Sequence, residues 1–452
     1  MRREWVLLGG TVVVTLALAL GVIRWLAPSL LGVAVDRQVV QMSDEVPPFY
    51  DGVFRADDMA TPMIQDPYVG QRHMVLVQEN STFKAPFDLL GFRNRSIPTV
   101  ADVVAIGDSQ TVGVNAPYDL NWPNLMARHL REKRARVYNI SKGGWGAVQY
   151  LYMFEKALFF RPRAVVVAFY TGNDPVDSVH IAYHHDAWEG LRALPGKPQA
   201  APSAWPPKES EVWSVTFADG VSTAFTPTTR LAPNNRDYPA TGEGYRIMAE
   251  VGRRIDKRAG IAQVPVVFTI IPTKEMAFAR KVAAEGLTPP ADYAALIDHE
   301  GKNIAALADA LRPLPNSRFV DVVGPLQQAV LGGKPVYPAR PDGHPVPGGY
   351  NVIAKTMSAA VNSLLPVPLG DGLVIVENQG GENQGRVFLV RDGGVFWFGD
   401  EAMLSGNGWA FDPAAIPRVK RRDLAGLRNM GFVETIDPKR YGPRTAVSGG
   451  GR

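Results

Sequence analysis

The sequence predicts an α/β fold in which a parallel sheet is covered by helices on both faces. Between residues 101 and 364, short apolar segments alternate with helical segments, which is the pattern of βαβ units. Two further observations extend this prediction. An uncharged apolar stretch at residues 5–23 predicts an N-terminal transmembrane helix, and a change of pattern after Pro366-Val367-Pro368 predicts a small β-rich C-terminal appendage.

The composition is that of a globular protein. Hydrophobic residues make up 46% of the 452 residues and charged residues 20%, which excludes long disordered regions and a fibrous protein. A multi-span membrane protein is excluded too, because the apolar residues are spread along the chain except at 5–23. The net charge of +4 is too small to indicate nucleic acid as a partner. The absence of cysteine excludes disulfides, thiolate metal sites and cysteine nucleophiles.

The N-terminal stretch has the length of a membrane span. Residues 5–23 contain no charge and would form a helix of about 28 Å, close to the ~30 Å hydrocarbon core of a bilayer. Arg2 and Arg3 precede the stretch and favour an N-terminus in the cytoplasm, with the rest of the chain outside it. The alternative is a cleaved signal peptide with Ala17-Leu18-Ala19 as its cleavage site.

The pattern divides the chain into four parts. We expect a transmembrane anchor at 1–27, an irregular lead-in segment at 28–100, the α/β domain at 101–365 and a β-rich region at 366–452 that ends in a disordered tail, 448–452. In the α/β domain the predicted strands are 101–106, 136–140, 164–170, 265–271 and 318–322, and the predicted helices are 121–133, 147–158, 242–258, 291–311 and 350–364.

Residues 177–241 break the alternation of strands and helices. They are rich in Pro, Trp and Asn and contain one hairpin candidate, 212–225, which turns at Asp219-Gly220. A long insertion without regular periodicity is usually functional, so we expect it to form a wall or a lid of the substrate cleft. The alternative is a surface excursion packed on the lead-in segment. In the C-terminal region, 373–377 and 386–398 are the expected strands.

Four polar segments follow predicted strands or precede the last helix. Gly107-Asp108-Ser109 ends the first strand, NISKGGWG (139–146) follows the second, TGND (171–174) follows the third, and Asp342-Gly343-His344-Pro345 precedes the helix 350–364. Because the ends of parallel strands meet at one edge of a sheet, these segments can converge there. Together they contain a nucleophile, an imidazole, a carboxylate and oxyanion donors, which are the groups that acyl transfer requires.

This combination resembles the GDSL/SGNH hydrolase superfamily in its bacterial membrane-anchored form, over about residues 90–365. The resemblance implies a flavodoxin-like three-layer SGNH hydrolase fold. It implies that Ser109 is the nucleophile, His344 the base and Asp342 the acid that orients it. It also implies an oxyanion hole formed by Ser109, Gly144 and Asn173. Asp342 lies two residues before His344, whereas the familiar spacing is three, so a backbone carbonyl could orient His344 instead.

Each of these residues also has a structural interpretation. His344 could be a loop histidine, Asn173 could form an Asx-turn with Asp174, and Gly144 could simply permit a turn. The cluster His184-His185-Asp186 lacks the carboxylates and spacing of a metal site, and we expect neither a metal nor an organic cofactor. The basic run Lys420-Arg421-Arg422 is expected to be a solvated face, or a contact with anionic lipid headgroups.

The expected function is that of a serine esterase anchored in the bacterial inner membrane through residues 5–23, with its catalytic domain in the periplasm. The expected substrate is an acylated carbohydrate, with acetyl esters of an envelope or extracellular glycan preferred. Trp145, Trp188, Trp205 and Trp213 would suit stacking on sugars, although they could equally be core residues. One alternative is an O-acetyltransferase that acts beside a membrane acyltransferase. Another is a non-catalytic envelope scaffold, against which the intact Ser109, Asn173 and His344 argue.

Overall fold

The computed structural model describes residues 63–66, 70–73, 87–88, 90–98, 100–133, 135–202, 207–365, 372–377, 386–391, 394–420, 424, 428–433 and 435–443. The expected transmembrane helix and the expected tail at 448–452 lie outside these residues. Within them, no helix combines the length and the apolar character that crossing a membrane requires.

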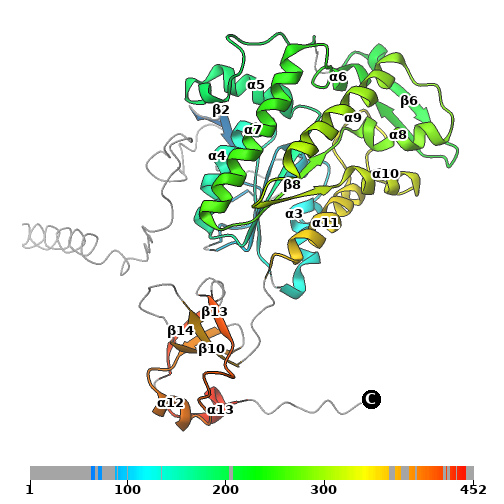
Figure 1. The fold of residues 1–452 in the computed structure, drawn as a ribbon. Helices are drawn as coiled ribbons and strands as arrows, with labels where there is room; N and C mark the ends of the chain where they lie inside the picture. The colour runs from blue at the N-terminus through cyan, green and yellow to red at the C-terminus, as the bar shows by residue number, and fades with distance from the viewer. Residues whose placement is uncertain are drawn as a thin grey trace, which may run out of the picture. The chain divides into compact units, whose positions relative to one another are not determined.

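A parallel sheet forms the centre of the α/β domain (Figure 1). It has five strands in the order β4-β3-β5-β8-β9. Its strands are β3 (Val103–Gly107), β4 (Val137–Ser141), β5 (Ala164–Tyr170), β8 (Val266–Ile271) and β9 (Ser317–Asp321). The predicted parallel sheet is confirmed. The strands β3, β5 and β8 are buried along their whole length, which explains their continuous apolar sequences.

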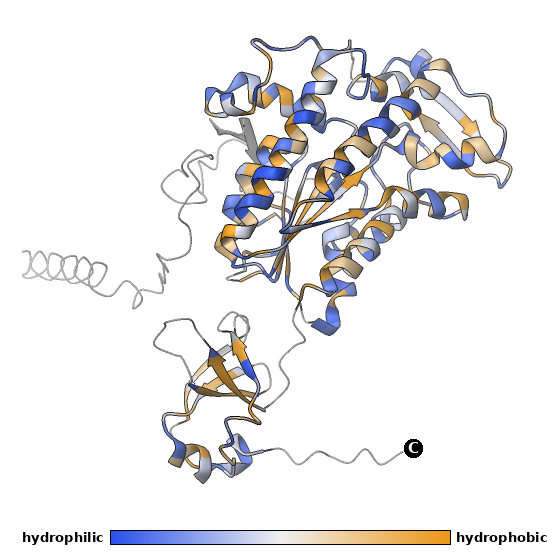
Figure 2. Ribbon diagram, in the orientation of Figure 1, coloured by the Kyte–Doolittle hydropathy of each residue, from blue (hydrophilic) through white to orange (hydrophobic). Residues whose placement is uncertain are grey.

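Two groups of helices cover the sheet. One contains α4 (Ala147–Ala157), α5 (Asp174–His184) and α7 (Pro239–Ala262), and the other contains α3 (Trp122–His129), α8 (Lys274–Ala284), α10 (Val323–Leu331) and α11 (Pro347–Asn362). The helix α9 (Ala291–Leu311) contacts both α7 and α8. Figure 1 shows α4 and α7 on one face of the sheet and α3 and α11 on the other. In Figure 2 the central strands are hydrophobic, while the helices carry both hydrophobic and hydrophilic residues.

The segment 177–241 has more regular structure than its sequence indicates, which corrects that expectation. Most of α5 falls within it, followed by the hairpin of β6 (Trp213–Thr216) and β7 (Ser222–Phe225) and by the short helix α6 (Pro227–Leu231). Proline occupies the first turn of α5, a position where it is tolerated because that N–H has no partner within the helix. The proline therefore stands in the first turn of a helix that we did not predict.

The β6–β7 hairpin packs on α8 and on residues 338–340. Ala224 N–H donates to the carbonyl of Ala339 over 2.8 Å. At the turn, the Lys281 ammonium pairs with Asp219 and lies over the ring of Phe217, 4.9 Å from its centroid. The hairpin is therefore anchored on α8 and on residues 338–340. Most of the lead-in segment 28–100 lies outside the described residues, so the cleft wall and the surface excursion both stay predictions.

The C-terminal region forms a second five-stranded sheet, with the order β13-β10-β11-β12-β14. Its strands are β10 (Gly372–Glu377), β11 (Val387–Arg391), β12 (Gly394–Trp397), β13 (Arg418–Lys420) and β14 (Arg428–Phe432). One face packs with α12 (Glu401–Gly406) and α13 (Pro438–Tyr441) around a core that includes Leu389 and Phe396. Arg421 and Arg422 lie outside the described residues, so both interpretations of the basic run stay predictions.

The remaining elements are short. The strands β1 (Met63–Asp66) and β2 (Gly70–His73) form an antiparallel pair, and the helix α2 (Ser109–Val112) follows β3. Short 3₁₀-helices lie at η2 (Tyr118–Leu120), η3 (Arg131–Lys133), η4 (Leu158–Phe160), η5 (Asp186–Leu191) and η6 (Glu209–Glu211).

Candidate active site

Ser109 begins α2, two residues after the end of β3, which lies between β4 and β5 in the sheet. Asp108 caps the helix, because its Oδ1 accepts a hydrogen bond from Gln110 N–H over 2.9 Å. Gly107 is required here, since a Cβ on it would lie 2.1 Å from Thr111 Oγ1. Gly113 ends the helix in the left-handed conformation, with φ = +86°. This tight turn places Ser109 at the carboxyl edge of the sheet, where open α/β folds bind ligands.

Ser109, His344 and Asp342 form one chain of hydrogen bonds. Ser109 Oγ lies 2.8 Å from His344 Nε2, and His344 Nδ1 lies 2.8 Å from Asp342 Oδ1. The structure thus brings the three residues together across 235 positions of sequence. The orienting partner of His344 is the Asp342 carboxylate, despite the short spacing, and not a backbone carbonyl.

The surroundings of Asp342 keep its carboxyl group ionised. Burial would raise its pKa, but hydrogen bonds from the His344 ring and the His344 backbone N–H outweigh burial and hold the pKa below its usual value. An ionised acceptor on Nδ1 favours the tautomer that carries its proton there. His344 Nε2 is then left to accept the proton of the Ser109 hydroxyl.

The Gly143-Gly144 turn lies against Ser109. A Cβ on Gly143 would be 3.6 Å from Ser109 Cβ, whereas a Cβ on Gly144 would meet no atom within 4 Å. Gly144 has φ = +76°, a conformation that side chains disfavour. No atom therefore fills the space that a Gly144 side chain would occupy. The role of the Gly144 N–H as an oxyanion donor stays a prediction.

Asn173 follows β5 and precedes the first residue of α5. Its Nδ2 donates to Asp177 Oδ2 over 2.5 Å. An amide nitrogen carries two hydrogens, so this bond fixes the amide and leaves a second hydrogen for another acceptor. Burial raises the pKa of Asp177 to about 6, and Asp177 therefore loses its proton near that pH.

Asp108 is a second carboxyl group near the triad of Ser109, His344 and Asp342, and it contacts Ser109. Its side chain is fully buried, and its Oδ2 lies 3.2 Å from Ser109 Oγ. Burial raises its pKa to about 7, against the lowering effect of the Gln110 N–H bond and of His344. The Ser109 hydroxyl thus has two acceptors, His344 Nε2 at 2.8 Å and Asp108 at the longer distance.

The tryptophans do not form the sugar platform that we expected, and this corrects the prediction for Trp145 and Trp188. Each is 1% exposed. Trp145 packs edge-on against Phe92, and Trp188 packs edge-on against Tyr152. A ring enclosed in this way has no face for a ligand, because burying so large an apolar surface is itself strongly stabilising.

The other two tryptophans give no support to the platform. The Trp213 ring is half-buried and lies 4.8 Å from the Tyr293 ring and 5.4 Å from the Phe225 ring, centroid to centroid. Its contacts are those of a residue at the edge of the core. Trp205 lies outside the described residues.

Two buried cations support the catalytic loops, and we did not single out either from the sequence. Arg93 donates to the carbonyls of Val112, Gly113 and Ala116, at 2.8, 2.6 and 2.7 Å, around the turn that follows Ser109. Lys274 Nζ donates to the carbonyls of Ala224, Pro338 and Arg340, at 2.9, 2.7 and 2.9 Å. No local motif marks such residues, because their acceptors are backbone groups distant in sequence.

The histidines near residue 184 contact one another through their rings. The His180 and His184 rings are stacked 5.5 Å apart, and His185 meets His184 edge-on at 4.8 Å. Among the residues that the structure describes, no group of three or more His, Asp or Glu side chains is arranged to hold a metal ion.

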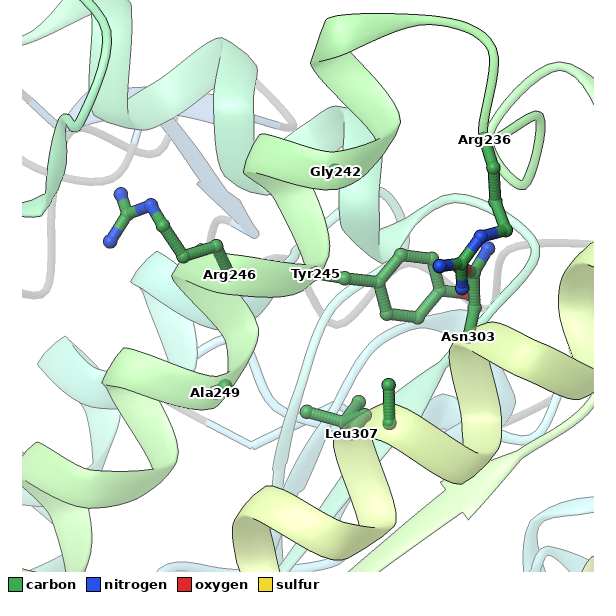
Figure 3. A pocket seen from close by; sticks show the side chains of 8 residues that line it. Arg236, Gly242, Tyr245, Arg246, Ala249, Asn303 and Leu307 are labelled. Atoms are coloured by element: carbon green, nitrogen blue, oxygen red, sulfur yellow. The ribbon is translucent and has the colours of Figure 1, made fainter.

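A pocket of about 310 Å³ lies between α7 and α9, separate from the triad (Figure 3). Figure 3 shows the Tyr245 ring reaching toward Arg236 and Asn303, whereas the Arg246 side chain points away. Tyr245 donates to Asn234 Oδ1 over 2.6 Å, and Asn234 Nδ2 donates to the carbonyl of Thr171 over 3.0 Å. The wall of this pocket is therefore tied to the segment that carries Asn173.

Comparisons with known proteins give matches among solved structures only. No protein-family model and no curated protein matches the chain. LAE5, an alpha/beta hydrolase enzyme from the metagenome of Lake Arreo, is 15% identical, with 59% of this chain and 98% of that chain covered and a TM-score of 0.33. A lipolytic protein of the G-D-S-L family from Desulfitobacterium hafniense is 13% identical, with 57% and 97% covered and a TM-score of 0.31.

A catalytic mutant of Axe2, an acetylxylan esterase from Geobacillus stearothermophilus, is 12% identical, with 59% of this chain and 95% of that chain covered and a TM-score of 0.33. Because identity and TM-score are low throughout, the functional argument depends on the hydrogen-bond geometry of the site.

Proposed function

We propose that this protein is a serine esterase of the SGNH type. One observation carries the proposal, namely the chain of hydrogen bonds from Asp342 through His344 to Ser109, with both bonds at 2.8 Å. This is the arrangement that makes a serine hydroxyl nucleophilic. The same contacts favour an enzyme over a non-catalytic scaffold, because a scaffold needs no such alignment.

The reaction has two halves. Ser109 Oγ attacks the ester carbonyl carbon while His344 Nε2 takes the hydroxyl proton. The N–H groups of Ser109 and Gly144 and the second Asn173 amide hydrogen stabilise the oxyanion. The tetrahedral intermediate then collapses, and the proton passes from His344 to the departing alcohol. Water attacks the acyl-serine in the same way, the acid leaves, and Ser109 regains its proton.

The structure supports distinct tasks for the flanking carboxyl groups. Asp342 stays ionised and favours the imidazolium that forms in each half-reaction. Asp177 holds the Asn173 amide by one hydrogen, so the other can face the oxyanion.

We further propose that the substrates are acyl esters, acetyl esters first, of an envelope or extracellular glycan. The support is the uncharged stretch at 5–23 with Arg2 and Arg3 before it, which favours an inner-membrane anchor and a periplasmic catalytic domain. Protease added to spheroplasts should then digest the chain. Digestion only after lysis would contradict this location.

Hydrolysis and transfer share the same acyl-serine. Passing the acyl group to a polysaccharide hydroxyl, with or without a membrane acyltransferase as donor, needs only a sugar in place of water. We keep this as the second candidate, because nothing in the triad distinguishes the two acceptors.

Turnover of p-nitrophenyl acetate by the full chain in detergent tests the proposal. We expect release of p-nitrophenol that is lost in Ser109→Ala. Oligosaccharide acceptors would raise p-nitrophenol release and yield acetylated sugar if transfer is the reaction. Absence of turnover in the wild type, together with no reaction of Ser109 with a fluorophosphonate, would contradict an esterase.

A further inference from the structure

We propose that Asn115 is a positioning residue of this active site, and that it acts with Arg340 by holding Asp342 through the oxygen turned away from the His344 ring. The inference deepens the proposed function and rests on it for its meaning in catalysis. Neither residue belongs to the four sequence segments that indicate an esterase.

The contacts of Asn115 use its whole amide. Its Nδ2 donates to Asp342 Oδ2 over 3.0 Å and to the carbonyl of His344 over 3.1 Å. Its Oδ1 accepts a hydrogen bond from Arg340 Nη2. Arg340 Nη2 also lies 2.9 Å from Asp342 Oδ2. Both hydrogens and the oxygen of the amide are therefore engaged with the loop that carries the acid and the base.

The backbone explains why asparagine stands at this position. Asn115 has φ = +69°, in the left-handed region where glycine and asparagine are tolerated best. The turn that holds it is tied to the nucleophile, since Val114 N–H donates to the carbonyl of Ser109 over 3.4 Å. Tyr350 holds the same turn through a 2.7 Å bond to the carbonyl of Val114. Asn115 thus joins the Ser109 turn to the Asp342–His344 loop.

The short spacing between acid and base makes this support necessary. With a single residue between them, Asp342 Oδ1 accepts both the His344 backbone N–H at 3.0 Å and the ring Nδ1 at 2.8 Å. Only Oδ2 remains to fix the rotation of the carboxylate about its last bond. The Asp342 side chain is 22% exposed, so water would compete for Oδ2 if Asn115 and Arg340 did not occupy it.

Arg340 adds charge to this contact. Its side chain is 62% exposed, so salt screens its field. In Arg340→Gln, kcat should therefore fall at low salt because Asp342 Oδ2 loses this partner, and the difference from the wild type should shrink in high salt.

Asn115→Gly is the informative variant, because glycine keeps the backbone conformation and removes only the amide. We expect kcat for p-nitrophenyl acetate to fall about 10- to 100-fold with KM nearly unchanged, since misplacing a catalytic group by about 1 Å costs this much. Asn115→Asp retains an acceptor for Arg340 but sets a negative charge against Asp342, and it should be slower still.

Gln263→Gly is the matched control. Gln263 has φ = +53° and caps the C-terminus of α7. It lies shortly before the start of β8, and therefore at the amino ends of the strands, whereas Ser109 lies at their carboxyl ends. The same change of residue at a left-handed position should therefore leave kcat and the pH profile unchanged.

A measurement that does not need turnover separates the positioning role of Asn115 from the proposed esterase function. The Nδ1 proton of His344 should give a downfield NMR resonance in the wild type, and in Asn115→Gly it should be broadened by exchange with water. Unchanged kcat and an unchanged resonance in Asn115→Gly would overturn the positioning role. A wild type that shows the resonance but hydrolyses no ester would overturn the proposed function, and broadening in the variant would still support the positioning of His344.

Discussion

Lys274→Met removes a buried cation that ties the β6–β7 hairpin to the catalytic loop. Lys274 is 1% exposed, and its ammonium donates to the carbonyls of Ala224, Pro338 and Arg340. Ala224 lies in β7, whereas the other two carbonyls lead directly to Asp342. Methionine has a similar length but no donor, so all three carbonyls lose their partner at once.

The expected loss follows from the three bonds. A hydrogen bond to a charged group contributes about 1.5–3 kcal/mol, and a buried acceptor left unsatisfied costs about 1–3 kcal/mol. Part of this is offset in the wild type, because burial of the ammonium is unfavourable and lowers the pKa of Lys274 to about 8. We therefore expect Lys274→Met to lower the free energy of unfolding by about 3 kcal/mol.

Urea unfolding followed by circular dichroism measures this loss. Lys302→Met is the matched control, because Lys302 is 58% exposed and pairs only with Asp298 on its own helix; it should change stability by less than about 0.5 kcal/mol. Without urea, Lys274→Met should also hydrolyse p-nitrophenyl acetate more slowly than the wild type, because residues 338–340 position Asp342. A Lys274→Met protein as stable as the control would refute the reasoning.

Three other variants test separate parts of the account. Asp177→Ala should free the Asn173 amide and lower kcat about 10-fold with little change in KM, and equal effects on both constants would point to substrate binding instead. Burial raises the pKa of Glu300 to about 7, so a protonated Glu300 stabilises the fold at low pH and this contribution is lost as the pH rises from about 4.5 to 7; thermal unfolding at pH 5 and pH 8 should therefore differ less in Glu300→Gln than in the wild type. Gly113→Ala adds a Cβ at 2.3 Å from that of Asn121 and at φ = +86°, and it should lower the unfolding free energy by about 1–3 kcal/mol, which a normal urea midpoint would contradict.

The strands were predictable because burial on both faces leaves a continuous apolar run in the sequence. The segments AVVVAFY and PVVFTII correspond to β5 and β8, with ends within one residue of the prediction. The proximity of Ser109, Asp342 and His344 could also be predicted from the positions of the strands. In a parallel sheet, residues that follow strand ends lie at one edge whatever their separation along the chain.

Three of the longer helices, α5, α8 and α10, were missed, each for a local reason. In α5 and α10, proline or glycine stands in the first turn, and we predicted no helix there although the first turn tolerates these residues. In α8, Thr273 caps the helix by accepting from Met276 N–H over 3.2 Å. That signal was present in the sequence and we did not use it.

The supporting contacts of the site could not be read from the sequence. The bond between Asn115 and Asp342 spans 227 positions, and no periodicity or motif relates the two residues. The sugar-stacking role of Trp145 and Trp188 was predicted wrongly because the sequence signal was ambiguous. Aromatic residues near a site in sequence are as suited to a core as to a ligand. Burial, which decides between these roles, depends on tertiary packing.

The central claim is that Ser109 forms the acyl-enzyme, and mapping the site of covalent modification tests it most directly. The full chain is treated with a fluorophosphonate, digested and analysed by mass spectrometry, with Ser109→Ala and His344→Ala treated in parallel. We predict stoichiometric modification of Ser109 alone, none in Ser109→Ala, and a rate lower by several orders of magnitude in His344→Ala. Modification of a different serine, or p-nitrophenyl acetate turnover that survives in Ser109→Ala, would contradict the account.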